Sequence, residues 1–249
     1  MQKEEIHMSA SILAWGAQSA PIAPGTQGTA TFNISEAGVS GRFVIGDWDG
    51  ALTSLQHRNT NLTTGQVPVG LFQALSVTNP RAYRYLQIND PLSASFINLA
   101  AAPAVAQIAC TAAPNQQDAL PYEGDALRQY SRSLICYGGD QVVDIAAGVT
   151  QQFTFQLLQA GRAGFVTIGA YAGAFGTAFL DGLVVTELTH NNVALIDSPT
   201  GVAAASFSPN NQDNPLWGMQ IDVNDRMTIS IRNDTAGLAE SVGVALTAG

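Results

Sequence analysis

Short runs of alternating apolar and polar residues, separated by Gly, Asn and Pro, extend along most of the chain after Pro21. Such runs, repeated every ~8–12 residues, are typical of antiparallel strands with one buried face. They predict strands over 29–34, 42–45, 67–77, 83–88, 92–99, 105–111, 152–158, 164–168, 179–189, 218–223, 227–232 and 241–247. We therefore expect an all-β protein built from small β-sandwiches.

One ten-residue pattern occurs twice, and the second copy follows the first by 133 positions (His57 to His190). Its shared positions are Thr53, Leu55, His57, Asn59 and Leu62, and then Thr186, Leu188, His190, Asn192 and Leu195. Flanking matches keep the same order: Phe32 with Phe155, Ile45-Gly46 with Ile168-Gly169, Gly50-Ala51 with Gly173-Ala174, Asn89-Asp90 with Asn224-Asp225, and Asn98 with Asn233. Collinear matches indicate a tandem duplication of a domain-sized unit. They also predict an insertion of about 10 residues near 176–185, before the second motif.

Two segments outside the repeat have helical spacing. Ile6, Ala10, Leu13 and Ala14 follow the acidic residues 4–5, which predicts a short N-terminal helix. In the connector, Asp125 is a candidate N-cap for a helix whose apolar face is Leu127, Tyr130, Leu134 and Ile135. We expect an N-terminal arm over 1–20, sandwiches over 21–112 and 145–249, and a connector with a short helix over 113–144.

Charged residues make up only 12% of the chain, against about 25% in typical soluble proteins. A surface so poor in charge suits a protein covered by copies of itself, although a secreted β protein with a neutral polar exterior has the same composition. The net charge of −9 argues against direct nucleic acid binding, which needs cations on phosphates. No apolar run approaches the ~20 residues of a membrane span, and the N-terminus does not resemble a signal peptide. We therefore expect synthesis in the cytoplasm without export.

Cys110 and Cys136 flank the connector and could form one disulfide around it. Two cysteines do not establish a disulfide framework, and cytoplasmic synthesis favours two reduced, buried thiols.

The repeated histidines raise the possibility of a metal site. Alternation would put His57 and Asn59 on one strand face, and His190 and Asn192 on another. A zinc or iron site needs three or four converging ligands, whereas each unit supplies one histidine, and the remaining one is His7. We therefore interpret these four residues as a structural signature of the repeat.

Calcium is a separate candidate, because Asp47 and Asp49 in the sequence Asp47-Trp-Asp49-Gly50 could supply oxygen ligands. The aligned segment of the second unit, 170–173, contains no acids, so the fold does not require them. A polar turn is the alternative. No other cofactor is expected.

Nothing in the sequence points to an enzyme. The chain has no nucleophile elbow, phosphate-binding loop, dinucleotide fingerprint or His-Glu-x-x-His motif. Tandem jelly rolls also occur in bicupins, whose metal motif contains His-x-His followed by a glutamate and a further histidine. Here the pattern is His-x-Asn with no later histidine in either unit, so a bicupin would have to be degenerate.

Two small sandwiches, a helical connector, an N-terminal helix, low charge and no catalytic signature resemble the double jelly-roll major capsid proteins of tailless icosahedral viruses, the smaller of which are bacteriophage proteins. The resemblance is architectural. It implies two tandem jelly rolls, a homotrimer that forms a pseudo-hexameric tile, and an icosahedral shell. It further implies penton or minor capsid proteins as partners and location in the virion. The N-terminal arm would then dock on a neighbouring subunit or lie near an internal membrane, whereas in an isolated protein it would pack on its own domain.

The alternative is a surface or secreted β-sandwich protein, or a spike or decoration subunit, that binds carbohydrate. Under the capsid hypothesis, the loops that differ between the units should lie at an exposed or intersubunit end. These loops contain Trp48 in the first unit, and Phe175 and Phe179 in the second.

Overall fold

The computed structural model describes residues 13–35, 37–46, 49–72, 85–113, 135–158, 160–170, 180–196, 198–208 and 219–248. The regular secondary structure of these residues is strand, apart from two short 3₁₀ helices, η1 (Val69–Phe72) and η4 (Ala204–Phe207). The expected all-β class is confirmed. Among the described residues, no helix has the length and apolar character needed to cross a membrane.

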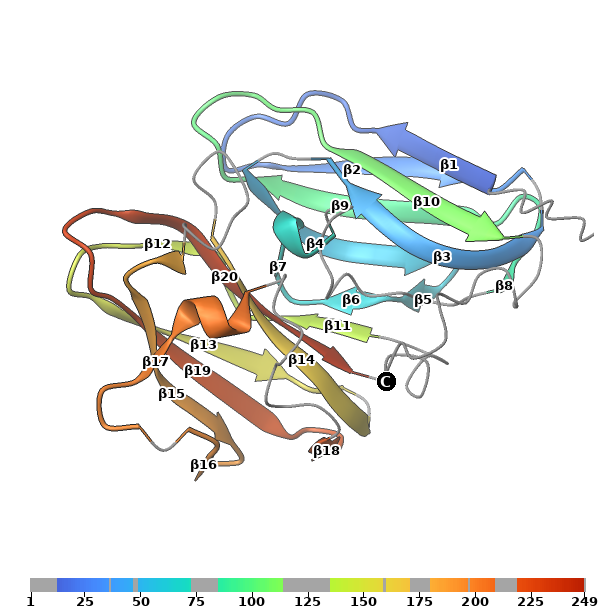
Figure 1. Cartoon of the computed structure of the whole chain (residues 1–249). Helices are drawn as coiled ribbons and strands as arrows, with labels where there is room; N and C mark the ends of the chain where they lie inside the picture. The colour runs from blue at the N-terminus through green and yellow to red at the C-terminus, as the bar shows by residue number, and fades with distance from the viewer. Residues whose placement is uncertain are drawn as a thin grey trace, which may run out of the picture.

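Unit one, residues 13–113, contains two antiparallel sheets (Figure 1). The first has the order β1 (Leu13–Gln18), β10 (Gln107–Ala113), β3 (Gly38–Ile45) and β8 (Tyr85–Leu86). The second has the order β2 (Gln27–Asn33), β9 (Pro91–Asn98), β4 (Gly50–His57) and β5 (Thr60–Asn61), and β7 (Val67–Pro68) also pairs with β4.

Unit two, residues 135–248, repeats this arrangement. One sheet contains β18 (Met219–Ile221), β14 (Gly161–Gly169), β20 (Ala239–Ala248) and β11 (Ile135–Gly138), with β12 (Val143–Ile145) also paired with β20. The other contains β13 (Thr150–Gln156), β19 (Arg226–Asn233), β15 (Leu183–His190) and β16 (Val193–Ala194), with β17 (Val202–Ala203) also paired with β15.

Each unit has its own hydrophobic core between its two sheets, which is the layering of a β-sandwich. The alternation predicted from sequence produces it: in β9 every second side chain is buried, and in β13 Phe153 and Phe155 point inward. The largest fully buried side chains are aromatic and come from both units: Tyr137, Phe43, Phe72, Phe96, Phe153, Phe155 and Phe207.

The duplication extends to individual hydrogen bonds. Buried Asn98, at the end of β9, donates from Nδ2 to the carbonyls of Ile22 and Ala102 at 2.7 and 2.9 Å. Asn233, at the end of β19, makes the equivalent bonds to Ile145 and Gly237, both at 2.8 Å. The register shifts that interrupt β4 and β15 also fall at equivalent positions, between Leu52 and Ser54 and between Val185 and Glu187.

The two units are joined through a strand that crosses between them. β6 (Thr63–Thr64) comes from unit one but pairs in parallel with β11 of unit two, with Cys136 opposite Thr63 (Figure 1). The contact continues where the Gln66 N–H donates to the Gly139 carbonyl at 3.0 Å and Oε1 of Gln66 accepts from the Val142 N–H at 3.0 Å. The larger sheet of unit two therefore includes a segment of unit one.

Glycines allow this close approach. Gly65 has a φ of 71°, and a Cβ there would lie 2.4 Å from the carbonyl oxygen of Gly138. Pro68 packs against Gly169 and Gly243 of unit two, where added Cβ atoms would lie 2.9 and 2.7 Å from the proline ring. Larger residues at these glycines would push the units apart.

The predicted N-terminal helix is wrong at its C-terminal end. Leu13–Gln18 is strand β1, paired with β10, and residues 1–12 lie outside the described part of the chain. The pattern of Leu13 and Ala14 fits a helix and a strand equally over so few residues, and pairing with β10 decides between them. The predicted connector helix falls on residues that are not described, except for Ile135, which begins strand β11. Both β1 and β11 lie outside the ranges expected for the sandwiches.

Several strand predictions also need correction. The range 67–77 contains the two-residue strand β7 followed by η1 in its described part. β11 and β12 had not been predicted, and β4 was expected only as a strand around His57, without bounds. The match of Gly50 with Gly173 is wrong, because Gly50 pairs with Asn98 and its equivalent Leu183 pairs with Asn233. Gly-Ala pairs are frequent in this chain and carry little alignment information.

The inserted residues therefore precede β15, in the connection from Gly169 to Leu183. The expectation that 176–185 is exposed is wrong where it can be tested, because Leu180, Leu183 and Val185 are buried in the core of unit two. The predictions for Trp48, Phe175 and Phe179 fall outside the described residues.

Candidate functional site

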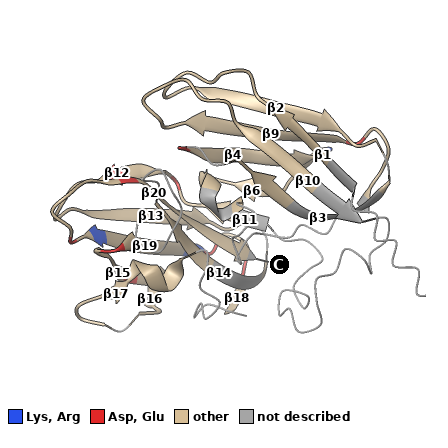
Figure 2. Ribbon diagram, turned by 45° about the horizontal axis from the view of Figure 1, so that its top comes forward, with Lys and Arg blue, Asp and Glu red and all other residues tan. Residues whose placement is uncertain are grey.

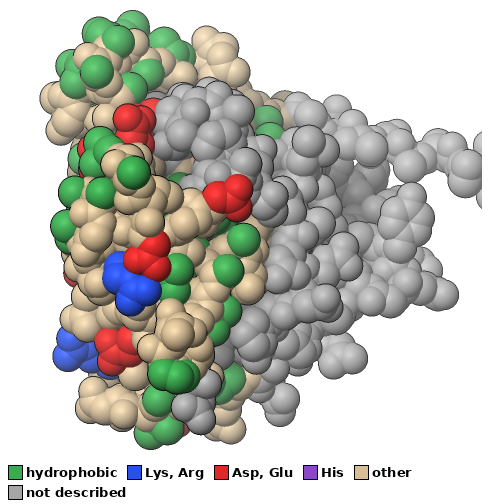
Figure 3. Space-filling view, turned by 60° about the vertical axis from the view of Figure 1, so that its left-hand side comes forward, with side chains coloured by type: hydrophobic (Ala, Val, Ile, Leu, Met, Phe, Trp, Pro, Cys, Tyr) green, Lys and Arg blue, Asp and Glu red, His purple; other side chains and the backbone are tan. Residues whose placement is uncertain are grey.

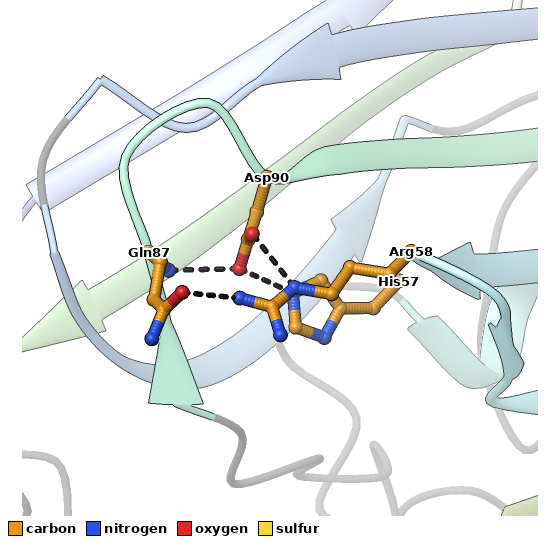
Figure 4. Close-up of polar contacts among 4 residues, drawn as sticks. All are labelled: His57, Arg58, Gln87 and Asp90. Atoms are coloured by element: carbon orange, nitrogen blue, oxygen red, sulfur yellow. Dashed lines mark hydrogen bonds and ion pairs between the residues drawn. The ribbon is translucent and has the colours of Figure 1, made fainter.

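His57, the repeated histidine of unit one, belongs to a polar cluster at the end of β4 (Figure 4). Nε2 of His57 lies 2.9 Å from Oδ2 of Asp90, in the turn before β9. Arg58 donates from Nε to Oδ1 of Asp90 at 2.7 Å and from Nη2 to Oε1 of Gln87 at 2.8 Å. The backbone N–H of Gln87 donates to Oδ2 of Asp90 at 2.8 Å. We call these four residues the first clasp.

The backbone of the first clasp depends on two residues with positive φ. Asn89 has a φ of 67° in the tight turn where the Asp90 N–H donates to the Gln87 carbonyl at 3.0 Å. Asn tolerates this left-handed conformation better than most residues. Arg58 has a φ of 54°, and its N–H donates to the carbonyl of Pro91 at 3.0 Å. The clasp thus ties the end of β4 to the beginning of β9.

Asp90 is a buried but ionised carboxylate. Burial acts to raise its pKa, but hydrogen bonds from Arg58, the Gln87 N–H and His57, with the charge of Arg58, hold that pKa at about 2. Because the carboxylate can only accept, Nε2 of His57 carries the hydrogen and donates it. The ring orientation of His57 is therefore fixed by Asp90.

Unit two contains the equivalent second clasp, made of His190, Asn191, Asp222 and Asp225. Nε2 of His190 lies 2.7 Å from Oδ2 of Asp225, and the Asp222 N–H donates to the same oxygen at 2.8 Å. Asn191 donates from Nδ2 to Oδ1 of Asp225 at 2.7 Å. The hydrogen bond from Asn191 is the main cause that lowers the pKa of Asp225 to about 2, and those from the Asp222 N–H and His190 add to it against the effect of burial.

The two clasps differ in charge and in exposure. Arg58 supplies a cation, whereas Asn191 at the equivalent position supplies a neutral amide. The His57 side chain is 5% exposed, against 20% for His190. The histidine of the first clasp is therefore less accessible to water than that of the second, and its aspartate has a charged partner in place of a neutral one.

The geometry of the clasps suits a structural role. A catalytic His–Asp pair needs a nucleophile or a water on the second ring nitrogen, and within the described residues neither histidine has a hydrogen bond to a hydroxyl or thiol. The described residues also contain no group of three or more His, Cys, Asp and Glu side chains that could hold a metal ion. What the clasps can do is fix two turns and the strands that enter them.

Two details of the predicted signature are wrong. Asn59 and Asn192 lie in the turns after β4 and β15 and not on the strand faces with His57 and His190, because the chain leaves the strand at the positive φ of residue 58 or 191. The histidines also have side-chain partners, which the sequence interpretation missed. The aspartates were visible in the repeat as the Asn89-Asp90 and Asn224-Asp225 matches, but their contact with the histidines was not.

The calcium candidates are described only in part. Asp47 lies outside the described residues, and Asp49 is half-buried beside Asp144 and Glu240 of unit two. Burial raises the pKa of Asp49 above its usual value and the neighbouring acids add to this, while a hydrogen bond with Ser241 opposes it. Oδ1 of Asp49 is buried without a hydrogen-bond partner. Calcium binding at Asp47 and Asp49 remains a prediction.

Cys110 is a buried thiol in β10, and burial raises its pKa to about 12. A thiol with that pKa remains protonated near neutral pH and is a poor nucleophile. The side chain of Cys136 in β11 is not described.

Comparison with known proteins adds no identification. No protein-family model matches the chain, and no curated protein matches its sequence.

Proposed function

We propose that this chain is a structural virion protein, the major capsid protein of a tailless icosahedral bacteriophage, with two tandem jelly rolls. The observation that carries the proposal is the strand order, which is the same in both units, together with β6 of unit one, which adds a strand to a sheet of unit two.

The strand order supports the jelly-roll part of the proposal. A jelly roll has eight strands in two sheets. In one sheet the first strand lies beside the last, followed by the third and the sixth; in the other the second lies beside the seventh, the fourth and the fifth. Unit one has β1-β10-β3-β8 and β2-β9-β4-β5, and unit two has β11-β20-β14-β18 and β13-β19-β15-β16. Both units fit the pattern if β6, β7 and β17 belong to the connections between the fifth and sixth strands, and β12 to the connection between the first and second strands of unit two.

The surface supports assembly from copies of the same chain. Charged side chains are few and scattered over both units (Figure 2). On the face in Figure 3, hydrophobic and uncharged side chains outnumber the charged ones. Surfaces of this kind suit extensive protein contacts, because burying a charge is costly unless it is paired. A duplicated domain also places like surfaces at near-equivalent positions around a ring.

Under this proposal three chains form a pseudo-hexameric trimer that tiles an icosahedral shell in the virion. Penton or minor capsid proteins are the other partners, and the residues before β1 contact a neighbouring subunit or an internal membrane. The clasps hold the turns of each jelly roll in place and perform no catalysis.

Solution mass and electron microscopy of the purified full chain test this proposal. We expect a particle with three times the 26.0 kDa mass of the chain, or multiples of it, with a hexagonal outline in negative stain. A monomer at all concentrations that binds glycans on an array would overturn the proposal in favour of a carbohydrate-binding surface protein.

A further inference from the structure

The junction between the units has two halves, and each half has an equivalent elsewhere in the chain. One half is the segment after β5 in unit one, which contains Leu62 and Thr63. The other half is β11, the first strand of unit two, which receives β6 at the edge of its sheet. The duplication places a second copy of the first half in unit two and a second copy of the other half in unit one.

β1 is the unit-one equivalent of β11. Each is the first strand of its unit and lies beside the last strand, β10 or β20. Their sequences also match, since Leu13-Ala-Trp-Gly16 aligns with Ile135-Cys-Tyr-Gly138. Within the described part of the chain, however, β1 is the terminal strand of its sheet and has β10 on one side only. Trp15 is half-buried, whereas its equivalent Tyr137 is buried beside β6.

Leu195 and Ile196 are the unit-two equivalents of Leu62 and Thr63. Leu62 donates its N–H to Leu55, and Leu195 donates its N–H to Leu188, so both segments leave the sheet in the same way. Leu62 is 2% exposed and belongs to the core of unit one, whereas Leu195 is 36% exposed. Val193, just before it, is 64% exposed. The leucine that is buried in unit one is therefore exposed at the equivalent place in unit two.

We propose that the Val193–Ile196 segment of one chain docks on β1 of a second copy and repeats between chains the junction that β6 and β11 make within a chain. This inference rests on the proposed homotrimer and specifies the contact that builds it. We choose a second copy as the partner because β11, the equivalent of β1, already receives the equivalent segment, β6, within each chain. Leu13–Gln18 and residues 193–196 contain no charged residue, and Asp197, which follows them, corresponds to Thr64, a residue that is only half-buried at the junction within the chain.

The contact has a direction, from unit two of one chain to unit one of the next. Such head-to-tail contacts close into a ring when each step has the right rotation. Alternating junctions within and between chains would give three chains six equivalent contacts. An open sheet edge is a frequent site of unwanted association, and in this ring β1 is covered as β11 is.

Light scattering and hydrogen-exchange mass spectrometry on the full chain test the contact. In the wild-type trimer, we expect slow exchange both in Leu13–Gln18 and in residues 193–196. Leu195→Lys should lower the particle mass threefold, to that of one chain, and should speed exchange in both segments, although they belong to different units. Val193→Lys provides a second variant at a more exposed position, in case Leu195→Lys misfolds.

Leu238→Lys is the matched control. Leu238 is also an exposed leucine of unit two. It follows the C-terminal end of β19, whereas residues 193–196 follow the second clasp, whose Asp225 precedes the N-terminal end of β19. The Leu238→Lys variant should leave the trimer and both exchange rates unchanged. A wild-type trimer that persists in the Val193→Lys and Leu195→Lys variants, or that loses protection only in residues 193–196, would overturn this contact and leave the proposed function standing. A wild-type monomer at all concentrations would overturn both.

Discussion

The two clasps occupy equivalent places in the two units, yet they hold their aspartates differently. In the first, Asp90 is paired with the cation of Arg58 and a nearly inaccessible His57. In the second, Asp225 is held by the amide of Asn191 and a more exposed His190. The geometry that both share is the histidine, the carboxylate and the backbone N–H three residues before it. The architecture therefore requires an anchored carboxylate, whereas the charge of its second partner can vary.

The largest expected difference follows from removing each aspartate. Asp90→Ala leaves the buried His57 without its acceptor and removes the ion pair of the half-exposed Arg58, which together should cost about 3 kcal/mol of unfolding free energy. Asp225→Ala removes a more exposed and less charged set of bonds and should cost about 1–2 kcal/mol. Urea unfolding of the full chain measures both, with Asp234→Ala in the exposed Arg232–Asp234 pair as a control that changes little. Equal losses at Asp90 and Asp225 would show that the cation adds nothing.

Both clasps should make the stability of the fold depend on pH in the acid range. Both aspartates have a pKa of about 2 in the folded protein, below the ordinary 3.8. Each therefore contributes stability above about pH 4, and that contribution is lost as the pH falls toward 2. We expect Asp90→Asn and Asp225→Asn to flatten the loss of stability between pH 4 and 2, measured by thermal unfolding. An unchanged slope in both variants would contradict the role given to these carboxylates.

Exchanging the variable partners should have a smaller effect. Residue 191 has a φ of 51°, a conformation that Asn accepts better than Arg, so Asn191→Arg should cost about 1 kcal/mol. Arg58→Asn loses a charged hydrogen bond but gains a residue suited to the φ of 54°, and should be nearly neutral. Thermal unfolding of both variants checks this asymmetry. A large loss in Arg58→Asn would mean that the cation is essential to the first clasp.

Replacing Asp49 should have the smallest effect on stability, and this effect should have the opposite sign to those above. Its pKa is raised by burial and by the neighbouring acids, so its ionised form destabilises the fold once the pH exceeds the ordinary value. Asp49→Asn should therefore raise the melting temperature slightly at pH 7 and have no effect near pH 3. If added calcium stabilises the wild type and the variant loses that response, Asp49 is a ligand and its negative charge serves the ion.

The repeated pattern made much of the fold predictable. The predicted ranges overlap β2, β3, β9, β10, β13, β14, β15, β18, β19 and β20, and alternation is clearest in β9, where every second side chain is buried. Strands that depend on a partner far away in the sequence could not be located in this way. Leu13–Gln18 is a strand only because β10 lies beside it, and β6 has its partner in the other unit. Pairing between distant segments is not encoded in local periodicity.

The site was predictable to a similar degree. His57 and His190 stood out because they recur, and so did Asp90 and Asp225, but their contact spans two strands and a turn. The strand face predicted for Asn59 failed because Arg58 adopts a positive φ, for which Arg has no preference. Exposure could not be predicted either, since Leu62 and Leu195 have the same place in the repeat, yet Leu62 is buried in the core of unit one and Leu195 is exposed.

The crossing strand β6 has a consequence for the order of events during synthesis. The ribosome releases Thr63 and Thr64 before Cys136 and Tyr137, so the segment that completes the sheet of unit two is available before that unit begins to form. Unit one can then act as a template on which β11 aligns, and the glycines at 65 and 138 allow the two segments to approach each other closely. A circularly permuted chain that begins with unit two would lose this template and should release an incomplete sheet with an exposed, aggregation-prone edge.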